Sequence, residues 1–463
     1  MPLIKSIAGV RGTLGGKIGE SLTPIDVVYI TTAFGKKITQ RTGKHCVVIG
    51  RDARPSGVTI SQIVSATLQN LGIHVIDLGL STTPTVALAV PQMQASGGIV
   101  ITASHNPAQW NALKLLNQAG EYIDAITADE IFALAAQHNH TFVETPYLGN
   151  YRYQSGYIEK HIQQILALPI IDQAAIAKRK FKVAIDAVNS TGGLAVPKLL
   201  QALGVATITA LHCQPTGIFS HDPEPLSENL TELANVIQQG DYDLGLAVDP
   251  DVDRLAIIDE TGQAWGEDYT LVAAADYVLG QTPGNTVSNV SSSSALQVLT
   301  AQYGGNYSAS AVGEMHVVAT MKANKAVIGG EGNGGVIYPA LHYGRDALVG
   351  IALLLAHLAK SGQTASGLRV GLPQFSMVKN KIALSAAIDI AAILEQFKEQ
   401  YSQYPIHTQE GVKVSLDKGW FHLRQSNTEP VVRIHAQGTT QEDAVHIMAQ
   451  VMETLQTYVP TAT

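Results

Sequence analysis

A serine at the end of an apolar segment is the first residue of this chain whose setting suggests chemistry. The apolar segment Gly98–Ile101 is typical of a buried strand, and Thr102-Ala-Ser-His-Asn-Pro107 follows it directly. The proline ends the regular structure, because the residue before a proline is pushed out of the helical region. Ser104 is therefore predicted to lie on a loop at a strand end, where open α/β sheets place their ligands. Many such serines only bond the backbone of their own turn, so the partners offered elsewhere in the chain decide between the two interpretations.

Three aspartates at alternating positions, Asp249, Asp251 and Asp253, lie between two apolar segments. Converging carboxylates repel one another unless a cation compensates them, and oxygen ligands suit Mg²⁺ or Ca²⁺. An EF-hand is excluded because its sixth position requires glycine and is Arg254 here, and because strand patterns flank the loop. A solvated hairpin turn is the alternative. We favour a divalent metal site with Mg²⁺, because three monodentate carboxylates leave room for a phosphate oxygen of a substrate.

The segment Gly329–Gly335 follows an apolar strand pattern and holds five glycines in seven residues. Glycine lets a ligand approach the backbone closely, and Glu331 and Asn333 offer groups that suit sugar hydroxyls. The spacing matches neither a dinucleotide fingerprint nor a P-loop. A tight structural turn explains the glycines equally well.

A second polar turn near the C-terminus combines cations and hydroxyls between two predicted strands. Arginine side chains, hydroxyls, an amide and backbone N–H groups on one turn make a phosphate clamp. The clamp residues are Arg424, Ser426, Asn427, Thr428 and Arg433. A capped turn with exposed arginines is the alternative interpretation.

Other cations follow predicted strands nearer the N-terminus. Arg11 lies among glycines, and Arg51-Asp52-Ala-Arg54 is interpreted as an ion-paired turn that supports its domain rather than as a ligand contact. Lys114, ten residues after Ser104, could reach back toward the serine, although such a lysine is more commonly a solvated surface residue.

The elements that must position these residues follow one plan three times: an apolar strand, a glycine-rich or polar turn, and a helical pattern. The plan starts at 46–57, 183–193 and 327–335, which indicates three α/β units with largely parallel sheets. In the tail, strands are expected over 382–387, 411–415, 420–424 and 431–436, and helices over 388–401 and 440–455. This mixed order predicts a smaller α+β domain. We expect domains over 1–150, 151–258, 259–368 and 369–463.

The amino-acid composition limits the classes of protein to which this chain can belong. The 463 residues suffice for several domains with large cores, since 46% are apolar and 15% are charged. No apolar stretch approaches the roughly 20 residues that span a bilayer; 347–356 is interpreted as a buried helix. The net charge of −8 argues against generic nucleic-acid binding. Two distant cysteines, Cys46 and Cys213, and the lack of a signal-peptide pattern favour a cytoplasmic protein without membrane partners.

In their order, these segments resemble the α-D-phosphohexomutase family. The family's phosphoserine loop, Thr-Ala-Ser-His-Asn-Pro, is present at 102–107, and its metal loop, Asp-x-Asp-x-Asp-Arg, at 249–254. Its sugar loop, Gly-Glu-x-Ser-Gly-His, corresponds to 330–335, and its phosphate loop, Arg-x-Ser-Gly/Asn-Thr-Glu-Pro, to 424–430. The resemblance covers nearly the whole chain and implies a four-domain, heart-shaped α/β fold with the site in a central cleft. Such an enzyme interconverts hexose 6-phosphates and 1-phosphates through a sugar 1,6-bisphosphate, which also acts as an activator.

The resemblance also implies roles. Ser104 carries a phosphoryl group, and Mg²⁺ bridges it to Asp249, Asp251 and Asp253. Arg11, His105, Lys114 and Arg254 surround the serine, with Lys114 a candidate general acid/base and His105 a support for the loop. Glu331 and Asn333 contact the sugar, and the clamp residues hold its phosphate.

The sugar loop departs from the family pattern, because Asn333 replaces the usual serine and Gly335 the usual histidine. This loop is similar to that of an archaeal-type branch often assigned to phosphoglucosamine mutase, so glucosamine phosphate is the expected substrate. Glucose and mannose phosphates are the alternatives. A sugar-phosphate phosphatase or a non-catalytic sugar-phosphate sensor would be a different class of protein. A monomer or a homodimer is expected.

Overall fold

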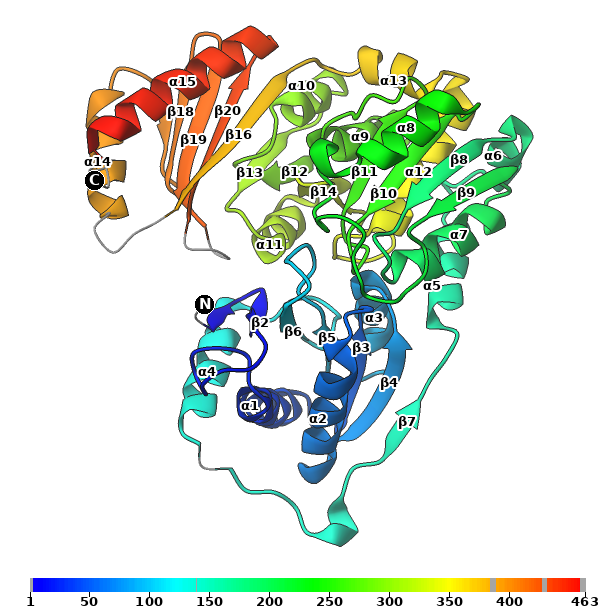
Figure 1. Cartoon of the computed structure of the whole chain (residues 1–463), viewed down its shortest axis with the longest axis vertical. Helices are drawn as coiled ribbons and strands as arrows, with labels where there is room; N and C mark the ends of the chain where they lie inside the picture. Colours follow the sequence, from blue (N-terminus) through cyan, green and yellow to red (C-terminus); the bar gives the residue numbers. More distant parts are fainter. Residues whose placement is uncertain (1–2, 139, 384–388, 427–430, 459–463) are drawn as a thin grey trace.

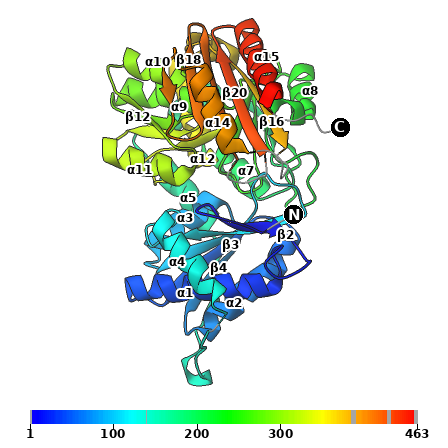
Figure 2. The same ribbon diagram turned by 90° about the vertical axis from the view of Figure 1, so that its left-hand side faces the viewer.

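The chain folds around four separate β-sheets, each in its own domain (Figure 1). The computed structural model describes residues 3–138, 140–383, 389–426 and 431–458. The second, third and fourth domains form a row, and the first domain lies below it (Figures 1 and 2). The prediction of three α/β domains followed by an α+β domain is therefore confirmed.

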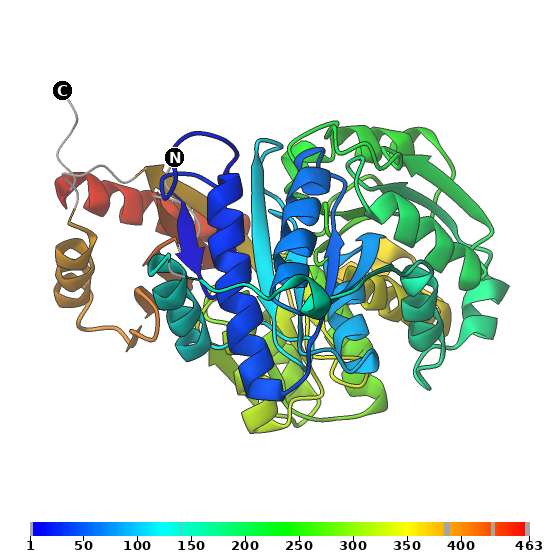
Figure 3. The ribbon, with the colours of Figure 1, turned by 90° about the horizontal axis from the view of Figure 1, so that it is seen from below.

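The first domain has a seven-stranded mixed sheet. Its spatial order is β1 (Ile4–Ser6), β2 (Gly9–Thr13), β6 (Trp110–Leu116), β5 (Gly97–Ile101), β3 (Cys46–Arg51), β4 (His74–Leu80) and β7 (Tyr151–Tyr153). The helices are α1 (Pro24–Thr42), α2 (Ser56–Asn70), α3 (Thr83–Gln92), α4 (Ala125–Ala136) and the short η1 (Thr145–Tyr147). Seen from below, α1 and α2 run side by side along this domain (Figure 3).

Two hydrophobic cores lie on the two faces of this sheet, because the side chains of each strand point alternately to one face and the other. Val47 and Ile49 of β3 join the core under α1, α2 and α4, whereas Val48 joins the core under α3. Successive residues of a strand point to opposite faces, so an uninterrupted apolar strand requires helices on both. The strands that end at the serine loop are thus held from both sides.

The second and third domains repeat a smaller plan with four strands each. The second contains β11 (Leu255–Asp259), β10 (Leu244–Val248), β8 (Lys182–Asp186) and β9 (Thr207–Leu211), with α5 (Tyr157–Leu166), α6 (Gln173–Arg179), α7 (Gly192–Ala202), η2 (Ser227–Asn229) and α8 (Thr231–Gln239). The third contains β13 (Tyr307–Ser310), β12 (Thr286–Asn289), β14 (Ile328–Glu331) and β15 (Gly335–Ile337), with α9 (Asp268–Gln281), α10 (Ala295–Gln302), α11 (Glu314–Asn324), α12 (Ala347–Ser361) and α13 (Ala365–Gly371). Each sheet has parallel inner pairs and one antiparallel edge strand.

One continuous core joins these two domains. Residues of β8, β10 and α7 share it with residues of α9 and α12 from the third domain. Helix α12 is buried along nearly its whole length, as predicted for 347–356. Among the described residues, no single helix has the length and apolarity to cross a bilayer; only α12 and α13 together pass that test, and they meet at 90°.

The fourth domain is an antiparallel sheet with two helices on one face. Its order is β16 (Ser376–Ala383), β20 (Val431–Gly438), β19 (Gly419–Gln425), β18 (Val412–Leu416) and β17 (Ile406–His407), with α14 (Ile390–Gln400) and α15 (Gln441–Tyr458). The predicted strands and helices of the tail are present, but β16 starts six residues earlier than expected. Positions 384–387 of that predicted strand lie outside the described residues.

The sheets also bear on where the domains divide. β7 pairs with β4 of the first sheet, so residues 151–153 complete the first domain. The expected boundary after 258 falls at the end of β11, and the one after 368 falls within α13. We therefore propose boundaries after 153, after 259 and between α13 and β16.

Candidate active site

The predicted serine lies in a sharply turned loop after β5. Ser104 is buried and has a φ of 50°, in the left-handed region that residues with a side chain rarely adopt. Its N–H donates to Thr102 Oγ1 at 2.9 Å, and Thr102 Oγ1 donates to Asp52 Oδ2 at 2.6 Å. The turn points Ser104 Oγ away from its own domain and toward the second domain.

A buried arginine holds the loop in this shape. Arg54 donates to the carbonyl oxygens of Ser104 and Asn106, both at 2.6 Å, and pairs with Asp52 at 3.0 Å. The Arg51–Arg54 segment is thus the supporting ion-paired turn that the sequence indicated. Arg54 has no exposed surface that a ligand could contact. Buried backbone carbonyls need such donors, because leaving them unpaired is costly.

The aspartate loop joins β10 to β11 and faces the serine. Asp249 Oδ2 accepts a hydrogen bond from Ser104 Oγ at 2.6 Å, and its Oδ1 accepts from the N–H groups of Asp253 and Arg254 at 3.0 and 3.1 Å. Val252 at the loop tip has a φ of 64°, which is unfavourable for a β-branched residue. The turn that joins the antiparallel strands β10 and β11 therefore places the carboxylates next to Ser104.

The three carboxylates fit a divalent cation. Each offers an oxygen within 4.8 Å of the others, and all three residues are fully buried. Asp251 Oδ1 and Asp253 Oδ1 are buried and accept no hydrogen bond from any described residue. Burial raises the pKa of Asp249 well above its ordinary value, and the negative charges of Asp253 and Asp251 raise it further. Unbonded carboxylate oxygens under mutual repulsion are the setting that a hard cation relieves.

Lys114 lies in β6, next to the serine loop. It reaches the aspartates rather than Ser104: Nζ lies 2.6 Å from Asp251 Oδ2 and 3.1 Å from Asp253 Oδ2. The lysine is buried, so the surface interpretation is wrong. Burial lowers its pKa, but the two carboxylates outweigh that effect and hold the pKa well above its ordinary value. Lys114 is therefore protonated and places a positive charge next to the aspartates.

The other predicted residues surround the serine loop. Arg11 donates to Asn106 Oδ1 at 3.1 Å, and His105 Nδ1 lies 3.4 Å from Ser104 Oγ. Burial and the charges of Arg254 and Arg11 hold the pKa of His105 well below its ordinary value, so the ring is neutral.

Glu224, which the sequence analysis did not single out, anchors Arg254 at 3.1 Å and lies 3.9 Å from His105. The residue lies in the long connection between β9 and α8, where no pattern marks it.

Arg345 is the central residue that the sequence analysis missed. Its guanidinium contacts three carboxylates: Asp253 at 2.8 Å, Glu331 at 3.0 Å and Glu314 at 3.0 Å. It thereby connects the aspartate loop to the glycine-rich loop. Burial raises the pKa of Glu314 to about 7 despite the opposing charge of Arg345.

The glycine-rich loop follows β14 at the same junction. Glu331 is buried and accepts from Asn289 Nδ2 at 2.8 Å and from the Gly313 N–H at 2.9 Å, in addition to its pair with Arg345. Asn333 accepts from the Gly335 N–H at 3.2 Å and so shapes its own turn. Glu331 therefore belongs to the charged junction, whereas Asn333 lies at its half-buried edge.

The phosphate-clamp residues lie in the fourth domain, where β19 ends and β20 begins. Arg424 pairs with Glu410 at 3.5 Å, Arg433 Nε donates to Ser426 Oγ at 3.3 Å, and Arg424 and Arg433 are directly opposite each other in the sheet. Asn427 and Thr428 lie outside the described residues. The charge of Arg433 is among those that depress the pKa of His105.

Comparison with known proteins gives the family. Four family models match in order: phosphoglucomutase/phosphomannomutase alpha/beta/alpha domains I, II and III at residues 5–141, 156–262 and 266–375, and the C-terminal domain at 377–454. The chain belongs to the phosphoglucomutase/phosphomannomutase family. It is a phosphohexomutase, an isomerase.

Relatives of this phosphohexomutase align over nearly their whole length. A phosphoglucomutase/phosphomannomutase of Thermococcus kodakarensis is 34% identical, covering 94% of this chain and 95% of that protein. A probable phosphoglucosamine mutase of Methanosphaera stadtmanae is 33% identical, covering 95% and 96%. The fold matches the crystal structure of a phosphoglucomutase/phosphomannomutase family protein from Burkholderia thailandensis with a TM-score of 0.83 at 24% identity, over 99% of this chain and 98% of that one.

The structure explains why this phosphohexomutase has glycine where the family's sugar loop usually has histidine. A Cβ atom on Gly335 would lie 2.3 Å from Arg345 Cδ and 2.9 Å from Arg345 Cγ. The stem of Arg345 therefore occupies the space into which a side chain at 335 would project.

Proposed function

We propose that this phosphohexomutase interconverts glucosamine 6-phosphate and glucosamine 1-phosphate, with Ser104 as the phosphoryl carrier. The observation that carries the role of Ser104 is its 2.6 Å contact with Asp249, across a domain junction and beside carboxylate oxygens that lack hydrogen-bond partners. The glucosamine substrate is supported by the Glu-Gly-Asn-Gly-Gly sugar loop and by the name of the Methanosphaera relative.

Asp249, Asp251 and Asp253, together with an oxygen on Ser104, would hold the metal ion, which we propose to be Mg²⁺. When bound, the ion supplies positive charge that stabilises a transferring phosphoryl group. Lys114 and Arg254 add positive charge at the same junction. Phosphoryl transfer depends chiefly on such positioning and electrostatics.

The clamp in the fourth domain would bind the phosphate that the substrate already carries. Arg424, Ser426 and Arg433 are its described members, and Asn427 and Thr428 complete the proposed set. With that phosphate anchored, the free hydroxyl at the other end of the sugar would face phosphorylated Ser104, with Glu331 and Asn333 contacting the ring hydroxyls.

Transfer then breaks the bond between phosphorus and Ser104 Oγ and forms one to the sugar oxygen. The proton that the sugar hydroxyl loses would be taken up by Lys114 once Lys114 has protonated Ser104 Oγ. The 1,6-bisphosphate must turn end for end before the other phosphate returns to Ser104. The same bisphosphate would load unphosphorylated enzyme, and so act as an activator. Because one clamp must accept either phosphate, bidentate arginines suit it. Lys114 is the proposed proton donor to Ser104 Oγ, and Arg11 and His105 would hold the loop.

Replacing Ser104 by alanine tests the carrier role. The purified wild-type protein is expected to contain a form one phosphate heavier, located on the Ser104 peptide by mass spectrometry. Ser104→Ala should lack this form and lose mutase activity, because no other described side chain donates to Asp249 at this junction. Activity of the wild type should disappear in EDTA and return with Mg²⁺.

The matched control is Ser155→Ala, an exposed serine between β7 and α5. This variant should keep the phosphorylated form and full activity. Full mutase activity in Ser104→Ala would sink the mechanism, and free phosphate without isomerised sugar from the wild type would identify a phosphatase.

The substrate is decided by comparing kcat/KM for glucosamine 1-phosphate, glucose 1-phosphate and mannose 1-phosphate, with the matching bisphosphate present. We expect glucosamine 1-phosphate to give the highest value. A higher value for glucose or mannose phosphate would reassign the substrate and leave the role of Ser104 unchanged.

A further inference from the structure

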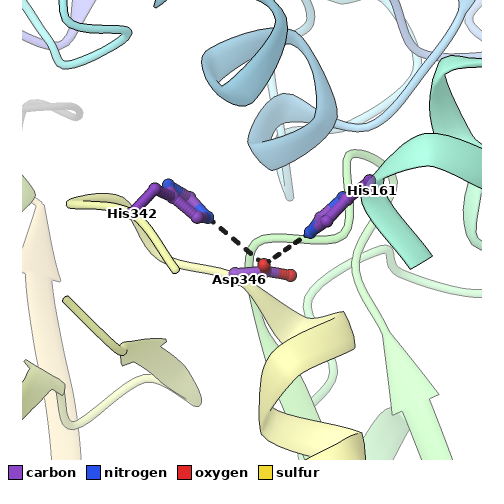
Figure 4. A group of neighbouring side chains, drawn as sticks. All are labelled: His161, His342 and Asp346. Atoms are coloured by element: carbon purple, nitrogen blue, oxygen red, sulfur yellow. Dashed lines mark hydrogen bonds and ion pairs between the residues drawn. The ribbon is translucent and has the colours of Figure 1, made fainter. Parts of the chain in front are cut away.

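Two histidines and an aspartate form a separate cluster where the first three domains meet (Figure 4). His161 comes from α5, His342 from the segment between β15 and α12, and Asp346 from the N-terminus of α12. Asp346 Oδ2 lies 2.9 Å from His161 Nε2 and 3.2 Å from His342 Nε2. The mechanism proposed above uses none of these three residues.

Contacts around the cluster orient each of the three groups. Asp346 Oδ1 accepts from the N–H groups of Leu348 and Val349 at the start of α12, so only Oδ2 faces the two rings. His161 Nδ1 is bonded to Thr85 Oγ1 of α3 at 2.9 Å, which directs Nε2 toward Asp346. In metal sites, the outer nitrogen of a histidine ligand is held by a partner of this kind.

The cluster is buried except for part of the His342 side chain. His161 and Asp346 have no exposed side-chain surface, whereas 11% of the His342 side chain is exposed. Burial raises the pKa of Asp346, but His161 and His342 outweigh that effect and hold the pKa below its ordinary value, so Asp346 is a carboxylate. The three ligand atoms lie within 4.8 Å of one another.

We propose that His161 Nε2, His342 Nε2 and Asp346 Oδ2 form a second metal site, which takes a transition-metal ion such as Zn²⁺. Imidazole nitrogen with one carboxylate suits Zn²⁺, whereas Mg²⁺ prefers oxygen ligands alone, as in the aspartate triad. Tetrahedral ligands at about 2.0–2.2 Å from Zn²⁺ lie roughly 3.3–3.6 Å apart, so each histidine nitrogen needs to move away from Asp346 Oδ2 by only a few tenths of an ångström. The two nitrogens, which lie within 4.8 Å of each other, would adjust to the same spacing. On binding, the proton that each Nε2 now directs at Asp346 Oδ2 would leave that nitrogen, either for Nδ1 or for solvent. Each neutral ring would then bind through Nε2 with its proton on Nδ1, and a water would complete the four ligands.

This site is connected to the aspartate triad from two sides. Helix α3, which carries Thr85, also carries Thr83, whose hydroxyl and N–H both donate to Asp251. Asp346 directly follows Arg345, which contacts Asp253. A metal ion here would therefore fix the junction of three domains next to the triad without occupying it.

Calorimetric titration of Zn²⁺ into the full-length protein, stripped of metal and then saturated with Mg²⁺, tests the site. Wild-type protein should bind one more equivalent of Zn²⁺ than His342→Gln. Loss of this ligand should weaken binding at the site by more than about 100-fold, since even an outer partner of a metal ligand contributes roughly 10–100-fold. Thr85→Val removes this outer partner of His161, together with the hydrogen bond between Thr85 Oγ1 and Thr82 Oγ1, and should weaken binding by about 10–100-fold. Co²⁺ added to the wild type should give the visible absorption of a tetrahedral complex, absent in His342→Gln.

The matched control is His221→Gln, because His221 also pairs with a carboxylate, Asp186 at 3.1 Å, beside a second histidine, His212. It should keep the additional Zn²⁺ equivalent. Cooperative thermal unfolding in chelator will show that each variant is folded. Equal Zn²⁺ binding by wild type and His342→Gln, or loss of the additional equivalent in His221→Gln alone, would overturn the proposal.

Discussion

At the scale of single residues, the site depends on two side-chain-bearing residues in left-handed backbone conformations. Ser104 and Val252 have φ values of 50° and 64° on the two loops that face each other. Such conformations cost of order 1–3 kcal/mol and persist only where surrounding contacts enforce them. Arg54 supplies those contacts to the serine loop, and Asp249 supplies them to its own loop. The strain allows Ser104 Oγ and the carboxylates to point at one another.

Arg345 is the residue whose substitution tests how these loops are aligned. Arg345→Lys keeps the charge, but a single ammonium cannot reproduce the planar fork that contacts Asp253, Glu331 and Glu314. We expect kcat/KM to fall by about 100-fold, the effect of displacing reacting groups by about 1 Å. Mg²⁺ affinity, measured by calorimetry, should fall as well, because Asp253 is no longer held.

Arg179→Lys is the matched control, since this exposed arginine donates only to the carbonyl oxygens of Gly362 and Gln363. It should retain wild-type kcat/KM and Mg²⁺ affinity. Activity of Arg345→Lys within a few-fold of the wild type would contradict the alignment role.

At the scale of elements, strand β19 contacts two domains, because its successive side chains point to opposite faces of the sheet. Phe421 and Leu423 point into the core under α14 and α15, while Trp420 and His422 point toward the third domain. There they meet the turn Ser291–Ser294 before α10. The same alternation brings Arg424 to the clamp, so the clamp and the domain contact belong to one face of the sheet.

His422 makes this contact sensitive to acid. Burial lowers its pKa to about 3, from an ordinary value of 6.5, while Ser291 Oγ lies 2.9 Å from its Nδ1. At pH values between about 3 and 6.5, His422 binds a proton in the unfolded chain but not in the folded chain. The free energy of unfolding therefore decreases as the pH falls through this range. The slope contributed by His422 is up to about 1.4 kcal/mol per pH unit. His422→Gln should reduce the pH dependence of the urea unfolding free energy between about pH 6.5 and 4 by that amount.

His446→Gln, on the exposed face of α15, controls for the loss of a titrating group. It should leave the slope unchanged, because its side chain is exposed on the surface of the helix. An unchanged slope in His422→Gln would mean that its protonation does not oppose folding.

At the scale of the whole molecule, the second and third domains depend on each other for folding. Their core is continuous, and α12 of the third domain packs against α5, α6 and α7 of the second. The first domain has its own two cores, and the fourth has one. The serine, the triad, the sugar loop and the clamp each come from a different domain, so only the assembled chain brings them together.

Two fragments test this dependence. Residues 157–375, which retain the common core, should give one cooperative urea transition by circular dichroism. Residues 157–262 expose the apolar side of the second domain that α9 and α12 cover, and should unfold without a cooperative transition. Residues 1–153 should fold cooperatively and serve as the control. Cooperative unfolding of 157–262 would contradict the common-core argument.

Much of this protein could be predicted from its sequence, because the relevant signals are local. Apolar strands that end in polar turns mark Ser104, the aspartates and the clamp, and the order of the four motifs indicates the family. The same local patterns predict the strands and helices of the tail and the buried helix at 347–356. Even the support role of Arg54 follows from its spacing to Asp52.

Only the tertiary structure decided how these parts are charged and connected. Arg345 is 92 positions from Asp253, and Lys114 is 137 positions from Asp251, so no spacing rule relates them. The one local hint of Arg345 was Gly335, which lacks a side chain because the arginine stem fills that space. His161 and His342 look unrelated along the chain and converge on Asp346 only because three domains pack together. The sequence determines which groups each strand end presents, because strand and turn propensities act over a few residues. Burial and long-range pairing determine their charge state and partners, because these depend on what the rest of the chain packs around them.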